Sequence, residues 1–100
     1  TEMRLISYLD DLYKRLQDPE YAAMYLEETL ASGDEAAFLI ALKDVVEASG
    51  GIGALAEHVD LQRPSLYKIL SKEGNPRLKT LQEILKPLGL RVSIIAEEAA

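Results

Sequence analysis

The residues that could carry out catalysis are few, and their spacing does not suit it. The chain has one histidine, His58, beside Glu57, and no serine or cysteine nucleophile is placed to use it. Adjacent carboxylates such as Asp10 and Asp11 point about 100° apart on a helix, so we interpret them as solvated faces rather than acid–base pairs or metal ligands. With no cysteine there is neither a disulfide nor a thiolate metal site. We expect no enzyme activity, no metal and no cofactor.

A short run of polar side chains is better suited to reading nucleic acid. Leu66 and Ile69 are spaced like the buried side of a helix, which turns the polar residues around them outward near its N-terminal end. That end of a recognition helix meets base edges in the major groove of DNA, where arginine, lysine and glutamine form hydrogen bonds with bases. We predict five base-reading residues: Gln62, Arg63, Ser65, Tyr67 and Lys68.

The charge distribution agrees with that interpretation, although the net charge is −6. Residues 1–60 hold four basic and thirteen acidic side chains, a balance of −9, whereas residues 61–80 hold five basic and one acidic, a balance of +4. Salt screens charges more than about 8 Å apart, so distant carboxylates do not cancel a local basic block. A solvated helix face would give the same pattern. The predicted phosphate contacts are Gly53, whose N–H would be exposed at a helix start, and Lys72, Arg77, Lys79 and Thr80.

Six helices are expected to position these residues within one domain of 100 residues. Asp18-Pro19 and Asp34 are typical starts of a second and a third helix, and Gly50-Gly51 ends the third. We expect N-terminal helices over 1–49, a helix-turn-helix core over 50–89 and a C-terminal strand over 90–96. The expected helices span residues 5–17, 19–33, 35–49, 52–59, 63–71 and 78–88.

The two short helices at 52–59 and 63–71 have the features of a helix-turn-helix. Ala56 is small where the second helix must cross close by, and Leu61 would insert from the turn into the core. Asp60 stands at the turn, where a positive φ is usually required and where aspartate tolerates it better than most residues. Paired short helices also occur in all-α domains that are purely scaffolds, so the pattern alone leaves both interpretations open.

The same segment resembles a known family. Leu66-Tyr67-Lys68-Ile69-Leu70-Ser71, followed by Gly74-Asn75-Pro76, is similar to bacterial addiction-module antidote proteins of the Xre/HigA-like helix-turn-helix class, which has a lambda-repressor-like fold. The upstream Asp18-Pro19-Glu20 also resembles that family, and the similarity covers about residues 8 to 92. The chain departs from the family pattern at Asp60, where glycine is common, and at Pro64 in the recognition helix.

The resemblance implies an antitoxin of a type II toxin–antitoxin module. Such a protein usually represses its own operon and neutralises a RelE/ParE-like toxin, and we expect it in the cytoplasm, with no membrane segment. Toxins of this kind tend to be basic, so we place the toxin on the acidic N-terminal helices. Two alternatives remain: a protein-interaction module of the same fold that inhibits a partner without binding DNA, and a general Xre-type transcriptional regulator.

The C-terminal residues change their periodicity. Leu90, Val92 and Ile94 alternate with polar residues, which predicts a strand, yet no second strand is visible in the chain. A lone strand cannot satisfy its backbone groups, so we expect the strand to pair with the same segment of a second copy in a homodimer. The alternatives are pairing with the toxin, or a tail that packs against the sixth helix. The predicted dimer interface is Leu90, Val92 and Ile94.

Overall fold

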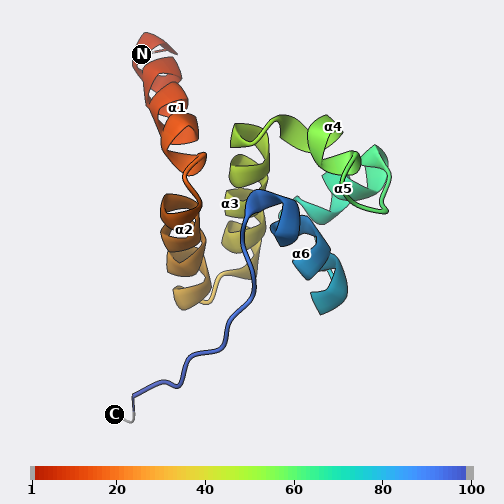
Figure 1. Ribbon diagram of the computed structural model, residues 1–100. Coiled ribbons are helices and arrows are strands. Elements are labelled where there is room, and N and C mark those ends of the chain that lie inside the picture. The colour runs from red at the N-terminus through yellow and green to blue at the C-terminus, as the bar shows by residue number, and fades with distance from the viewer. Residues whose placement is uncertain (1, 99–100) are drawn as a thin grey trace.

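The computed structural model describes residues 2–98, and in that part of the chain the regular structure is entirely helical. Helices α1, α2 and α3 pack together on one side, and α4, α5 and α6 form the other side (Figure 1). The predicted all-α class and the number of α-helices are confirmed for these residues. The elements are α1 (Glu2–Leu16), α2 (Pro19–Ala31), α3 (Glu35–Ala48), α4 (Gly51–Ala56), α5 (Arg63–Ile69), α6 (Leu78–Leu85) and the short 3-10 helix η1 (Lys86–Leu88).

Two aspartates start helices where the sequence predicts it. The carboxylate of Asp18 accepts a hydrogen bond from the N–H of Glu20 at 3.1 Å, with Pro19 as the first helical residue of α2. The carboxylate of Asp34 accepts one from the N–H of Ala37 at 3.0 Å and so begins α3. Each contact satisfies a backbone donor that has no partner inside its helix, which fixes where the helix begins.

Helix α3 lies at the centre of the core and is buried along most of its length. Leu42 is fully buried and Val45 nearly so, and α1, α2 and α4 all pack against this helix. The other half of the core comes from α4, α5 and α6, through Ile52, Leu66 and Ile84. Because these three helices share one core with α3, α5 is held on a rigid support.

The first half of α1 extends beyond this core (Figure 1). Leu5, Leu9 and Leu16 recur at helical spacing and so form an apolar stripe along α1. Leu5 and Leu9 are exposed, whereas Leu16 at the other end of the helix is buried. The helix itself was predicted correctly, and only its C-terminal half packs into the core.

The connection between α4 and α5 is longer than expected. Helix α4 ends at Ala56 rather than Val59, so residues 57–62 join the two helices instead of a turn of three or four residues. The prediction for Asp60 was wrong, because no residue other than glycine has a positive φ among the described residues. Among the described residues, positive φ occurs only at glycines, and two of them lie where α4 begins: φ is 109° at Gly50 and 88° at Gly51.

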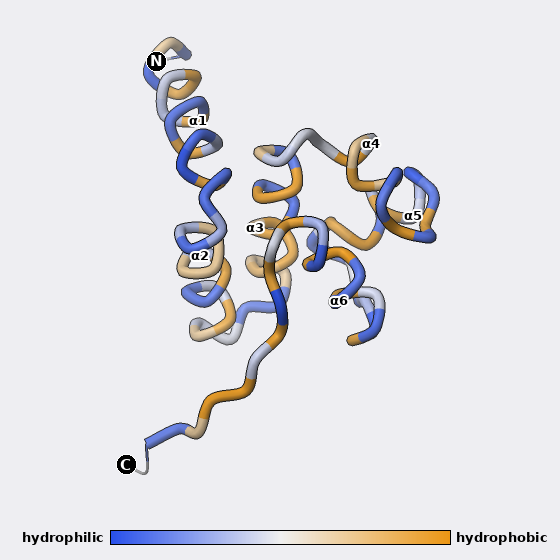
Figure 2. The backbone as a smooth tube through the Cα atoms, viewed as in Figure 1, coloured by the Kyte–Doolittle hydropathy of each residue, from blue (hydrophilic) through white to orange (hydrophobic). Residues whose placement is uncertain are grey.

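The predicted C-terminal strand is absent from the described residues. The segment after Gly89 has no regular structure and extends away from the helices, with hydrophobic residues in its middle and hydrophilic residues at its described end (Figure 2). The N–H of Leu90 still donates to the carbonyl of Leu85 at 3.1 Å, and Leu90 packs against the core. Beyond it Val92 is exposed and Ile94 is 96% exposed. The prediction of a strand from the alternating apolar residues was wrong, because the single chain offers no second backbone for a strand to pair with.

Candidate nucleic-acid interface

Helix α5 presents its polar residues to solvent as the sequence predicts. Leu66 is completely buried and Leu70 nearly so, and these two residues fix the rotation of the helix on the core. The opposite side is open, and the ring of Tyr67 is 54% exposed although it is aromatic. A helix anchored on one side with polar groups on the other has the arrangement that groove recognition requires. All five predicted base-reading residues are exposed: Gln62, Arg63, Ser65, Tyr67 and Lys68.

Two residues with separately predicted roles, Arg63 and Gly53, lie together. The guanidinium group of Arg63 lies over Gly53 of α4, and a Cβ added there would be 3.2 Å from a guanidinium nitrogen. The absent side chain of Gly53 therefore lets Arg63 pass across α4. Gly53 was predicted as a phosphate contact through its N–H. In the structure this glycine also sets the position of a base-reading candidate, which its sequence neighbours gave no means of predicting.

The cations that flank α5 are open to solvent. Lys72, Arg77 and Lys79 are exposed, whereas Thr80 is half-buried in the first turn of α6. Within residues 2–98, the one ion pair joins Arg15 to Asp11 on α1, at 3.3 Å. None of the flanking cations is thus neutralised by a carboxylate in the described part of the chain, which leaves their charge available to an anion.

The loop that follows α5 is tied down by short-range contacts. The hydroxyl of Ser71 donates to the carbonyl of Lys68 at 2.8 Å and accepts from the N–H of Glu73 at 3.3 Å. Gly74 donates its N–H to the carbonyl of Ser71, and any Cβ on Gly74 would overlap the carbonyl oxygen of Ile69. These contacts direct the chain from α5 to Lys72 and Arg77. The sequence marks this segment as a break and gives no sign of the close approach.

Three other features of the described residues could bear on function: a metal site, a membrane-spanning helix and His58. They contain no group of histidine, cysteine, aspartate or glutamate arranged to hold a metal ion. In residues 2–98, no helix has the length and apolar character needed to span a membrane. His58 is exposed in the connection between α4 and α5 and makes no side-chain hydrogen bond among these residues.

Comparison with known proteins decides the family. Residues 6–96 match the model of a family described as "Probable addiction module antidote protein". The chain belongs to this addiction-module antidote family. An uncharacterised protein of Haemophilus influenzae is 31% identical over 84 residues, which cover 84% of this chain and 86% of that protein. No solved structure matches the chain significantly.

Family membership confirms the coarse part of the resemblance. An antidote acts against a toxin, so family membership implies a toxin partner. The match spans both the helices of the acidic half and the candidate nucleic-acid interface. The narrower assignment to the Xre/HigA-like class stays a prediction.

Proposed function

We propose that this antidote is a DNA-binding antitoxin that represses its own operon and neutralises a RelE/ParE-like toxin. The observation that carries the proposal is the arrangement of α5, whose buried Leu66 turns a row of exposed polar side chains to one side. Exposed cations flank that row without ion-pair partners in the described chain. Together they match a base-reading helix set between phosphate contacts.

The two groups of residues have different tasks in this proposal. Arg63, Lys68 and Gln62 read donors and acceptors on base edges, with Ser65 and Tyr67 completing the contact surface. Lys72, Arg77 and Lys79 neutralise phosphates and so contribute affinity for any DNA, as do Thr80 and the backbone at Gly53. Specificity then depends on α5, and salt-sensitive affinity depends on its flanks.

The proposed protein acts as a homodimer. A two-fold axis would place two α5 helices about 34 Å apart, on successive major-groove faces of a near-palindromic operator. Val92 and Ile94 are apolar, exposed and adjacent to Leu90, which anchors the segment to the core. Covering these side chains with a second copy removes apolar surface from water, which favours association.

One observation favours a second candidate function. The six residues between α4 and α5 exceed the usual turn of a helix-turn-helix, which favours a toxin inhibitor in which this pair of helices is a scaffold without DNA contact. Binding of the protein to its upstream promoter, compared with random DNA at low salt, separates the two. Preference for the promoter supports the proposed repressor, and failure to bind either DNA supports the second candidate.

Toxin neutralisation needs a separate measurement. The reading frame next to this gene is expressed alone and together with the antidote, and growth is followed. We expect growth arrest with the neighbouring protein alone and recovery on co-expression. Recovery without promoter binding would again identify the second candidate, and the absence of any arrest would contradict toxin pairing with that neighbour.

A further inference from the structure

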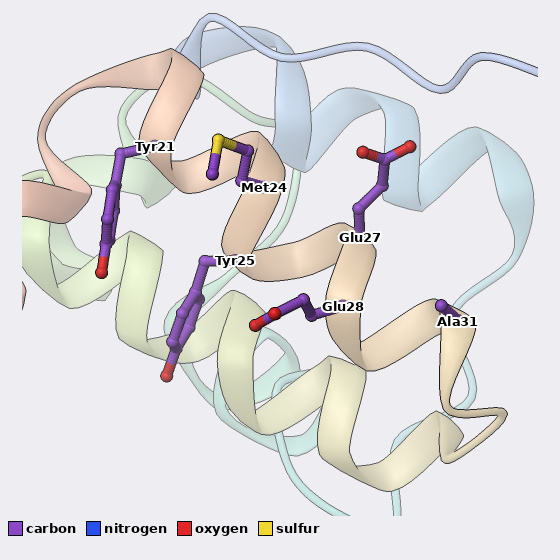
Figure 3. Close-up of a pocket in the computed structure, with 6 residues that line it drawn as sticks. All are labelled: Tyr21, Met24, Tyr25, Glu27, Glu28 and Ala31. Atoms are coloured by element: carbon purple, nitrogen blue, oxygen red, sulfur yellow. The ribbon is translucent and has the colours of Figure 1, made fainter.

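Helix α2 carries an exposed face of aromatic, apolar and acidic side chains (Figure 3). Tyr21 and Tyr25 project from the same side of the helix, and Glu28 extends toward Tyr25 in this view. Met24 lies between the tyrosines along the chain and is 63% exposed. With Ala31 at its far end, this face lines a shallow hollow of about 560 Å³. We call Tyr21, Met24, Tyr25 and Glu28 the tyrosine face.

A contact with α3 holds the tyrosine face in place. The hydroxyl of Tyr25 donates a hydrogen bond to the carboxylate of Asp44 at 2.9 Å. Partial burial, this hydrogen bond and the negative charge of Asp44 raise the pKa of Tyr25, so its hydroxyl stays a donor throughout the neutral range. A tyrosine ring fixed in this way loses little conformational freedom when a partner binds, which favours its use in an interface.

The charge that α2 contributes to this face has one sign. Helix α2 contains three glutamates and no lysine or arginine, and Asp44 adds another carboxylate beneath Tyr25. In the described residues, none of these four carboxylates forms an ion pair. Tyr21 and Tyr25 are half-buried, and a partly exposed aromatic ring beside a carboxylate attracts a cationic side chain through both the ring face and the charge. The tyrosine face therefore matches a basic partner.

We propose that the tyrosine face is the docking surface for the toxin, with a lysine or arginine of the toxin lying over Tyr21 or Tyr25 and against Glu28. This inference rests on the proposed antitoxin function and locates the toxin on one face of one helix. It also separates the two binding activities, because α2 and α5 lie on opposite sides of the molecule (Figure 1).

Other occupants fit this surface less well. A second copy docked about a two-fold axis would bring the same acidic face against itself, which like charges oppose. DNA would bring phosphates against the same carboxylates. Only a cationic partner gains from both the charge and the rings, and the expected toxin is such a partner because it is basic.

The test measures the affinity of the full-length antidote for the purified protein encoded by the neighbouring reading frame. Glu28→Arg and Met24→Lys change exposed side chains of the tyrosine face, so the fold should tolerate them. We expect each to weaken binding about tenfold or more. Glu57→Arg, in the connection between α4 and α5, makes the same charge change far from α2 and should change affinity less than about threefold. Unchanged promoter binding by the α2 variants would show that they are folded.

Each outcome has a distinct meaning. If the wild-type protein binds the neighbouring protein and the α2 variants bind equally well, the tyrosine face is not the docking surface, although the antitoxin function stands. If the wild type does not bind at all, the proposed toxin partnership fails first, and the docking proposal with it. If the α2 variants convert a dimer to a monomer in sedimentation, the face joins two copies of this chain, and the proposal is overturned.

Discussion

Arg63 is the residue that best separates base reading from phosphate binding. Arg63 is the first residue of α5, and its guanidinium group lies over Gly53 of α4. Arg63→Ala should cost about 1–3 kcal/mol at the operator and relax the preference at one base position. Lys72→Ala is the matched control, because it removes a flanking cation, and it should weaken binding to operator and to random DNA alike. Equal losses on both DNAs for Arg63→Ala would show that Arg63 touches only phosphate.

Two glycines near the interface should differ in how much stability the protein loses when each is replaced by alanine. Gly74→Ala places a methyl group against the backbone carbonyl of Ile69, so the fold should lose about 1–3 kcal/mol of unfolding free energy. Gly53→Ala meets the mobile end of Arg63 inside a helix, and the better helix propensity of alanine should offset the contact within about 1 kcal/mol. Urea denaturation measures both. A Gly74→Ala protein as stable as the wild type would contradict the close approach described above.

Tyr25 gives a pH-dependent signature. Because its pKa is raised in the folded protein, the unfolded chain releases this proton first as the pH rises past about 10, and folding stability then falls. Tyr25→Phe loses the bond to Asp44, which should cost about 1 kcal/mol at neutral pH, but it also removes this alkaline decline. The stability difference between the two proteins should therefore narrow above pH 10. Parallel curves would show that the phenol is not held by Asp44.

At the scale of elements, the chain after η1 carries the proposed dimer interface. Val92 and Ile94 are exposed, so replacing both with lysine should leave the fold intact, shift the protein toward monomer and sharply weaken operator binding. Ile6→Lys is the matched control, since Ile6 is an exposed apolar residue on α1. Analytical ultracentrifugation distinguishes the two variants. A dimer that survives the double substitution and is lost with Ile6→Lys would place the interface on the helices.

The sequence could predict those features of the helices that depend on neighbouring residues. The carboxylates of Asp18 and Asp34 satisfy N–H groups within three residues of themselves, so the helix starts follow from neighbouring residues alone. Periodicity also predicted the buried side of α5. It could not predict that Leu5 and Leu9 stay exposed, because their burial depends on whether another helix reaches them.

The errors in the prediction have the same origin. The positive φ expected at Asp60 was inferred from an ideal helix-turn-helix, and α4 ends earlier than such a motif requires. The alternation after Leu90 indicates a strand only when a second backbone is present to pair with it. The contact between Arg63 and Gly53 joins two helices, and the two residues are ten positions apart in the sequence. Relations of this kind depend on packing, which composition and spacing do not specify.

At the scale of the whole molecule, the charge of the antidote is divided between two regions. The acidic residues 1–60 include α2 and its tyrosine face, and the basic residues 61–80 include α5 and its flanks. Under the proposed function, this segregation places a basic toxin and DNA on separate surfaces of one small chain. The net charge of −6 describes neither surface.

The salt dependence of promoter binding is the most direct test of DNA binding by this antidote. Fluorescence anisotropy with the upstream promoter and with random DNA gives the affinity at a series of salt concentrations. We expect affinity to fall steeply and linearly on logarithmic axes, with the slope reduced by about 1 for each of Lys72→Ala, Arg77→Ala and Lys79→Ala. The promoter should remain preferred over random DNA at every salt concentration. No binding at low salt, or binding without a salt slope, would contradict a DNA-binding antitoxin.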